Sequence, residues 1–383
     1  FFFNTNNDGY YRLNIMARRI GRKNGSMKMS IPTLCLFVAT LVLSDKNSFA
    51  FTTTTQNSVK ICNSEIKTYL SSALNDKAEI PAKTSNAGKF ICSFDSTDFS
   101  GRTAWPYTAA DLNRLDNSDD SKFYDSPRLV KHIDDFAIQS LTDFYKKTFE
   151  NVARGENCEG EGATMTIDIL DLCSSWISHL PVVDSNSNFR YGKVVGLGMN
   201  QDELEANPQL SECIVQDLNT NPKLVSLDDE SFDFVTMTVS IDYLVKPLEV
   251  MQEIQRVLKP KGSALVSFGD RCFPTKAIAM WLQADSIDRI TIVASYLHYA
   301  QFDQEANMDG GVNDNDGQNE QLFQWKSIDA FDLKEEPREV PSKPSMGELI
   351  SNPALGLAWM NSASAVQKVN NCDPLFVIKA VKS

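Results

Sequence analysis

The sequence has few of the residues that build metal centres and disulfide frameworks. Its eight cysteines include no Cys-x-x-Cys pair, and its three histidines, His132, His179 and His298, lie far apart in the chain. Zinc sites and small disulfide-linked folds need such residues at close, regular spacing. The sequence therefore predicts no metal site and no disulfide framework, and we expect the thiols to be reduced and mostly buried.

Basic residues and long apolar runs are also scarce. Lys and Arg total 37 against 50 Asp and Glu, which gives a formal net charge of −13. Nucleic-acid binding depends on basic side chains that neutralise phosphates, so we expect no nucleic-acid partner. No run beyond residue 50 approaches the roughly 20 apolar residues that a transmembrane helix requires, and we expect no membrane segment in the mature protein.

The N-terminal region differs from the rest of the chain. "IPTLCLFVATLVL" follows a group of basic residues; it is too short to span a bilayer as a helix but suits the apolar part of a signal peptide. Ala50 and Phe51 come next, before a Ser/Thr-rich stretch that has no acidic residue until Glu65. We expect residues 1–50 to be upstream sequence and a signal peptide, and residues 51–95 to be a flexible, transit-like segment.

This arrangement resembles the two-part presequences that direct proteins into the complex plastids of some algae. The resemblance rests on Ala50, Phe51 and the composition around them. It implies a plastid location, with an ordinary secretory signal as the alternative.

From residue 96 onward the chain reads as one α/β domain with its core at 124–300. Continuous apolar runs, typical of strands covered on both faces, alternate with helical patterns. The first helix is predicted from Ser126, with Pro127 at its first position. The pattern predicts a doubly wound parallel sheet. The expected strands are 165–172, 191–199, 212–218, 232–240 and 263–269, and the later helices start at Gln201 and span 247–258 and 275–299.

The C-terminal part departs from this alternation. Residues 303–320 are polar and acidic and predict a loop, and two strand-like runs at 325–333 and 374–382 have no helix between them. Such a pair is expected to be antiparallel at one edge of the sheet. The segment 334–373 has no assigned role.

Candidate ligand-binding residues follow the strands, because open α/β sheets bind ligands beyond the carboxyl ends of their strands. The first of these ends reads "DLCSSW", with Asp171 followed by the turn Cys173, Ser174, Ser175 and Trp176. The turn has no glycine, and each residue with a Cβ costs about 1–2 kcal/mol in a left-handed conformation. A phosphate-bearing cofactor is therefore disfavoured, and with it a nucleotide-dependent oxidoreductase. A cofactor without phosphate remains compatible.

Residues 227–268 carry the family resemblance. The opening "SFD", the helix ending "EIQRVLKPKG" and the strand after it closely resemble class I S-adenosylmethionine-dependent methyltransferases of the type 11 group. The resemblance implies a seven-stranded, mostly parallel sheet whose last strand is antiparallel. It also implies S-adenosylmethionine as the cofactor and methyl transfer to an unidentified, small-molecule acceptor.

The resemblance also assigns site residues. The family's glycine-rich first turn is replaced here by the Ser-Ser-Trp variant, and Gly198 stands where an acidic residue usually binds the ribose. Asp217 and Leu218 match the residues that hold the adenine. The expected cofactor-binding residues are Asp171, Cys173, Ser174, Ser175, Trp176, Gly198, Met199, Asn200, Asp217 and Leu218, and the expected acceptor-binding residues are Tyr124, Arg128, Arg271 and Cys272.

No catalytic residue is identified by the sequence. His179 is isolated, and a lone histidine is more typical of a structural position than of a general base. The departures at the first turn and at Gly198 leave a second reading open, in which the chain is a non-catalytic binding or scaffold module with the same fold.

Overall fold

The computed structural model describes residues 88–155, 164–304, 320–334 and 370–383, together with 340, 342–346, 359–360, 362–364 and 366–367. The expected targeting region 1–50, most of segments 51–95 and 334–373, and nearly all of the acidic loop 303–320 lie outside these residues.

One sheet of eight strands organises the described residues. Its order is β1-β7-β8-β6-β5-β2-β3-β4, and the pairs from β4 through to β6 are parallel. β8 is antiparallel to both β6 and β7, as predicted for the last strand. The strands are β1 Lys89–Phe94, β2 Met165–Leu172, β3 Phe189–Gly198, β4 Glu212–Val215, β5 Phe232–Thr238, β6 Leu258–Gly269, β7 Trp325–Asp332 and β8 Leu375–Lys382.

The eighth strand corrects the expected count of seven. β1 pairs antiparallel with β7, from Lys89 opposite Asp332 to Phe94 opposite Ile328. The sequence placed these residues in a flexible segment. Cys92 and Phe94 are buried because alternate side chains of a strand point to the same face. The sheet therefore begins before residue 96, and β1 covers the edge that the antiparallel pair of β7 and β8 was expected to form.

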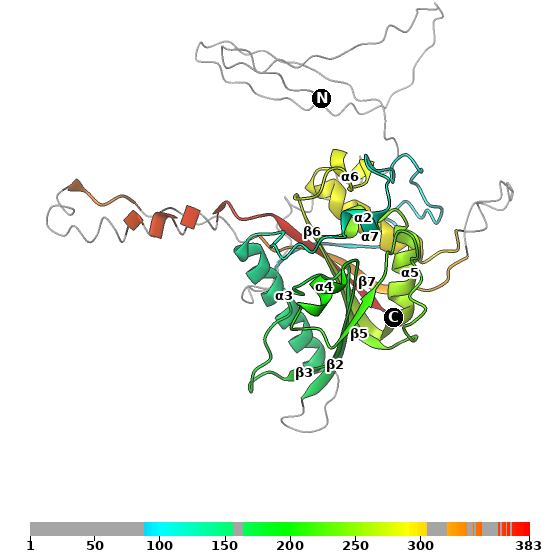
Figure 1. Cartoon of the computed structure of the whole chain (residues 1–383), viewed down its shortest axis with the longest axis horizontal. Coiled ribbons are helices and arrows are strands. Elements are labelled where there is room, and N and C mark those ends of the chain that lie inside the picture. The colour runs from blue at the N-terminus through cyan, green and yellow to red at the C-terminus, as the bar shows by residue number, and fades with distance from the viewer. Residues whose placement is uncertain are drawn as a thin grey trace, which may run out of the picture. The chain divides into compact units, whose positions relative to one another are not determined.

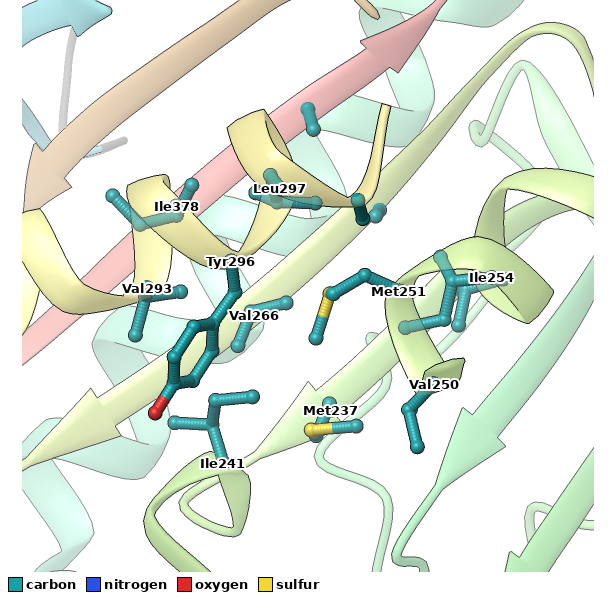
Figure 2. Packing of buried hydrophobic residues seen from close by; sticks show 14 of the residues in the cluster. Met237, Ile241, Val250, Met251, Ile254, Val266, Val293, Tyr296, Leu297 and Ile378 are labelled. Carbon is teal, nitrogen blue, oxygen red and sulfur yellow. The ribbon is translucent and has the colours of Figure 1, made fainter. Parts of the chain in front are cut away.

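Helices cover both faces of the sheet, as expected for a doubly wound domain. α3 (Asp135–Gly155) packs on one face, and α5 (Pro247–Val257) and α7 (Ser286–Ala300) pack on the other (Figure 1). β2 supplies side chains to both cores: Ile167 and Ile169 pack with α3, and Leu170 and Leu172 belong to the opposite cluster. Figure 2 shows Tyr296 of α7 and Met251 of α5 packed over the strands in that second cluster.

The first long helix begins later than predicted. α3 starts at Asp135, not at Ser126, because Asp134 accepts hydrogen bonds from the backbone N–H groups of Phe136 and Ala137 (both 2.9 Å), as N-cap residues do. Asp134 also exchanges two backbone-to-carboxylate hydrogen bonds with Asp373. The helix start is thereby fixed to the chain just before β8, and residues 126–134 run as irregular chain across the carboxyl ends of the strands.

Two further boundaries differ from the sequence prediction. The helix expected at 275–299 is divided into α6 (Ala279–Gln283) and α7, because Asp285 and Asp288 form a capping box that starts a new helix. The strand expected at 232–240 ends at Thr238, since Val239 has φ +45°. A β-branched residue in this region is an outlier, and extended pairing stops there.

The connection after β2 has no helix. Residues 173–188 run from β2 to β3 as turns and irregular chain, so the end of β2 lacks the helix N-terminus that phosphate sites in α/β proteins use. The remaining short elements are α2 (Asp120–Phe123), α4 (Gln201–Glu205) and the 3-10 turn η1 (Ile241–Tyr243). Within the described ranges, every helix is too short or too polar to cross a bilayer.

Candidate functional site

A cavity of about 270 Å³ lies at the carboxyl ends of the parallel strands. Its walls are the turn after β2, the ends of β3 and β5, the chain after β4, the loop after β6 and the segment 120–133. All fourteen residues that the sequence singled out line this one cavity: Tyr124, Arg128, Asp171, Cys173, Ser174, Ser175, Trp176, Gly198, Met199, Asn200, Asp217, Leu218, Arg271 and Cys272.

The turn after β2 keeps a left-handed residue although it has no glycine. Cys173 has φ +54°, which costs a residue with a Cβ about 1–2 kcal/mol. Asp171 offsets this strain: its Oδ2 accepts a hydrogen bond from Ser174 Oγ (2.6 Å) and its Oδ1 accepts one from Thr236 Oγ1 (2.8 Å). Asp171 is buried and connects the turn to β5, so its role in the structure is to hold the turn against the neighbouring strand.

Gly198 has a steric reason for being glycine. The backbone N–H of Ser174 donates to Leu197 O (2.8 Å), so the turn lies directly on the end of β3. A Cβ at position 198 would overlap the carbonyl oxygen of Ser174. No acidic side chain fits where the family usually has one, because the turn occupies that space.

Glu203, which sequence reasoning missed, places a carboxylate at the same end of β3. It lies in α4, is buried and lines the cavity. Its Oε2 accepts a hydrogen bond from Ser175 Oγ and its Oε1 accepts one from the backbone N–H of Arg128, both at 2.6 Å. The only sequence signal is its position in the first turn of the helix that follows β3.

Two predicted cofactor residues anchor the segment 120–133. Asn200 caps α4 by accepting from Glu203 N (3.0 Å), and its Nδ2 donates to Tyr124 O (2.8 Å) and Asp125 O (3.1 Å). Trp176 Nε1 donates to Val130 O (3.1 Å). The segment that closes the cavity is therefore attached to the residues expected to contact the cofactor.

Asp217 and Leu218 follow β4 as predicted, but the strand is shorter than expected. The carboxylate of Asp217 accepts from Asn219 N (2.8 Å) and Thr220 Oγ1 (2.6 Å), which are the hydrogen bonds of an Asx turn. Leu218 is buried and gives this wall an apolar surface. The carboxylate shapes the turn, and the leucine lines the cavity.

The expected acceptor residues come from the segment 120–133 and from the loop after β6. Arg271 pairs with Asp373 (2.9 Å), and burial raises the pKa of the Cys272 thiol. Tyr124 follows α2, and burial raises its pKa well above the ordinary range. The guanidinium of Arg128 lies over the ring of Phe123, 4.1 Å from its centroid.

Burial sets the protonation of two nucleophile or base candidates. It raises the pKa of Cys173 to about 12, with the charges of Asp171, Asp242 and Asp217 adding to the shift. It lowers the pKa of His179 to about 4, assisted by His132 and Lys131. Near neutral pH the thiol is protonated and the imidazole is neutral, so neither a thiolate nor an imidazolium is available at this wall.

A buried ion network below α2 also escaped sequence reasoning. Asp120 lines the cavity and pairs with Arg114 (2.8 Å) and with Lys276 (3.1 Å), whose side chain is almost completely buried. Burial acts to raise the pKa of Asp120, but hydrogen bonds from Arg114, Asn219 and Lys276 outweigh it and lower the pKa. The network joins α2 to the chain before α6 and fixes one end of the segment 120–133.

The described residues do not form a metal centre. No group of three or more His, Cys, Asp or Glu side chains is arranged there to hold a metal ion.

Comparison with known families now decides the class of the domain. Residues 185–266 match the model of a family described as a methyltransferase domain. This part of the chain is therefore similar to a methyltransferase domain. The match overlaps residues 227–268, on which the sequence resemblance rests, and it confirms that resemblance together with methyltransferase as the enzyme class and S-adenosylmethionine as the cofactor of the family. The turn 173–176 precedes the matched region.

Solved structures with similar folds include several methyltransferases. The complex of the Trm112 methyltransferase activator with a methyltransferase from Haloferax volcanii is 14% identical, over 66% of this chain and 99% of that one, with a TM-score of 0.34. An S-adenosylmethionine-dependent methyltransferase from Mesorhizobium loti is 11% identical, over 64% and 100% of the two chains, with a TM-score of 0.30. No curated protein matches the chain.

A third similar structure contains two bound molecules. Phosphoethanolamine N-methyltransferase 2 from Haemonchus contortus, in complex with phosphomonomethylethanolamine and S-adenosylhomocysteine, is 13% identical. The similarity covers 61% of this chain and 53% of that one, with a TM-score of 0.29.

The close contact between the turn and Gly198 can be tested by substitution. Gly198→Ala should lower the free energy of unfolding by about 3 kcal/mol, because the new Cβ overlaps the Ser174 carbonyl and backbone must move. Gly101→Ala is the control: Gly101 has φ +63° but no atom within 4 Å of the added Cβ, so only about 1 kcal/mol of backbone strain is expected. Equal losses in chemical denaturation would contradict the steric explanation.

Asp242 generates a prediction about pH. Burial raises its pKa from 3.8 to about 7, and Oδ2 has no hydrogen-bond partner among the described residues. The folded state binds this proton more tightly than the unfolded state, so stability that is present below pH 3.8 is lost as the pH rises through 7.

Between about pH 5 and pH 8, Asp242 should lower the unfolding free energy of the unmodified protein by about 2 kcal/mol. Asp242→Asn should abolish this decrease. Denaturant titrations at the two pH values measure this difference, with exposed Asp228→Asn as the control. A variant whose pH dependence equals that of the unmodified protein would show that Asp242 does not titrate in this range.

Proposed function

We propose that the protein binds S-adenosylmethionine in the cavity at the strand ends and transfers its methyl group to a small-molecule acceptor. One observation carries the proposal: residues from five separate parts of the chain, chosen from sequence alone, surround a single cavity. The cavity lies where open α/β sheets bind their ligands, and its size is near the lower end of the range for small-molecule sites.

The chemistry of the walls fits this cofactor. Leu197, Leu218 and Val239 give apolar surface for a planar ring, and Glu203 places a carboxylate beside the end of β3. No helix follows the turn after β2, and S-adenosylmethionine, unlike a nucleotide, has no phosphate that would need a helix N-terminus. Residues of the turn 173–176, Gly198 to Asn200, Glu203 and Leu218 would hold it.

When bound, the cofactor supplies an activated methyl group, and the protein has to bring the acceptor into line with it. Such a displacement gains mainly from proximity and orientation. The rigid turn held by Asp171 and the attachment of the segment 120–133 through Asn200 and Trp176 serve that purpose. The Cys173 thiol is protonated, which speaks against a covalent intermediate on this residue.

The alternative of a non-catalytic module has one observation in its favour. Asp171, Ser175 and Asn200 are hydrogen-bonded to other protein groups rather than left free for a ligand. Such satisfied groups are also typical of a pre-organised site, in which second partners fix the side chains in place.

Calorimetric titration with S-adenosylhomocysteine tests the cofactor proposal. We expect binding, and we expect Glu203→Gln to weaken it at least tenfold, because the neutral amide loses the charge-assisted hydrogen bonds at this wall. Glu205→Gln on the same helix, where the side chain is exposed, should leave the affinity unchanged. Absence of binding at millimolar ligand would refute the cofactor proposal, and equal affinities of the two variants would refute the role of Glu203.

We further propose that the chain before β1 directs the protein to a plastid. The proposal is supported by the apolar run at 31–43, Ala50 and Phe51, and the acid-poor stretch behind them. Residues 1–87 fused to a fluorescent protein should reach the plastid of an alga with complex plastids. Phe51→Ala should retain the fusion outside the plastid stroma. Secretion of the unmodified fusion would instead establish the ordinary signal-peptide reading.

A further inference from the structure

Arg128 differs from the other cationic side chains that line the cavity. Lys131 pairs with Asp135 (2.5 Å) and Arg271 pairs with Asp373 (2.9 Å). The guanidinium of Arg128 has no ion pair within the described ranges, and its Nη1 is enclosed by protein without a hydrogen-bond acceptor. An enclosed donor without a partner costs about 1–3 kcal/mol, and more when it is charged.

The carboxylates at the wall do not compensate for this charge. Both oxygens of Asp171 and of Asp217 accept hydrogen bonds from neutral protein groups. Glu203 accepts from the backbone N–H of Arg128, not from its guanidinium. The acids near the ends of β2, β3 and β4 are satisfied locally, and the positive charge of Arg128 is left for a ligand.

Aromatic rings hold the guanidinium in a fixed plane. Its carbon lies 4.1 Å from the ring centroid of Phe123 and 5.3 Å from that of Phe273, and Nη2 donates to Phe123 O (2.8 Å). Phe273 also contacts the rings of Tyr243 and His132. A guanidinium fixed in this way offers a positive charge at a set position to a carboxylate, and the neighbouring rings are suited to an apolar or aromatic body.

The backbone of Arg128 lies at Glu203, but its side chain extends to Phe273 in the loop after β6. The side chain therefore reaches the wall that includes Tyr243, Cys272 and Phe273. We infer that Arg128 is the docking cation for a carboxylate of the methyl acceptor, which makes the acceptor an organic anion. This inference rests on the proposed function.

The test uses the full chain saturated with S-adenosylhomocysteine and two planar probes of equal shape, benzoate and benzamide. We expect benzoate to bind at least tenfold more tightly than benzamide, because only the anion forms charge-assisted hydrogen bonds with a guanidinium. Arg128→Gln should reduce this preference to about twofold or less, and Arg128→Lys should retain part of it. Arg190→Gln, at an exposed arginine of β3, should retain all of it.

A second comparison distinguishes the two possible sources of the carboxylate. S-adenosylhomocysteine carries a carboxylate and methylthioadenosine does not. If Arg128→Gln weakened the first tenfold and left the second unchanged, the anion would be that of the cofactor and the assignment to the acceptor would be wrong. We expect both to change by less than about threefold.

Two other outcomes also overturn the inference: no preference for benzoate in the unmodified protein, or an undiminished preference in Arg128→Gln. Binding of S-adenosylhomocysteine by each variant shows that it is folded. If the unmodified protein does not bind S-adenosylhomocysteine, the proposed function is refuted. If it binds S-adenosylhomocysteine but does not prefer benzoate, only the inference about the acceptor is refuted.

Discussion

The candidate site depends on one close contact, between the turn after β2 and the end of β3. The turn lies so near to β3 that position 198 has no space for a side chain. In the related family the glycines belong to the turn, and the strand end carries the acid. Here the turn carries side chains, and the glycine stands on the strand. In this chain the glycine on the strand permits the close backbone approach.

This exchange has consequences for the other walls of the cavity. Ser174 and Ser175 provide hydroxyl groups that bond to Asp171 and Glu203, which glycines could not do. Glu203 then connects the turn to the backbone of Arg128, and Trp176 connects it to Val130. The residues that replace the glycines therefore attach the segment 120–133 to the sheet. They also carry a cost, because Cys173 remains in a left-handed conformation.

Local sequence patterns predicted most of the strands, whereas the errors arose where distant segments meet. The strands β2 to β6 were recognised because continuous apolar runs reflect burial on both faces. β1 was missed because residues 89–94 form a short edge strand whose partner, β7, lies more than 200 residues away in the sequence. The start of α3 was misplaced because Ser126 and Pro127 form a plausible helix start, whereas the carboxylate of Asp134, held by Asp373, forms the real one.

The sequence by itself determined the fold class, because apolar periodicity and strand ends are local properties of the chain. Its resemblance to a known family then indicated which residues gather at the carboxyl ends of the strands. Only the tertiary structure decided what those residues do. It showed that Asp171, Asn200 and Asp217 use their polar atoms in hydrogen bonds to other protein groups. It also showed that Glu203 lines the cavity and that Arg128 lacks a counter-ion within the described residues. Hydrogen-bond partners and steric overlap depend on segments that are distant in the sequence, and no local pattern records which of them meet.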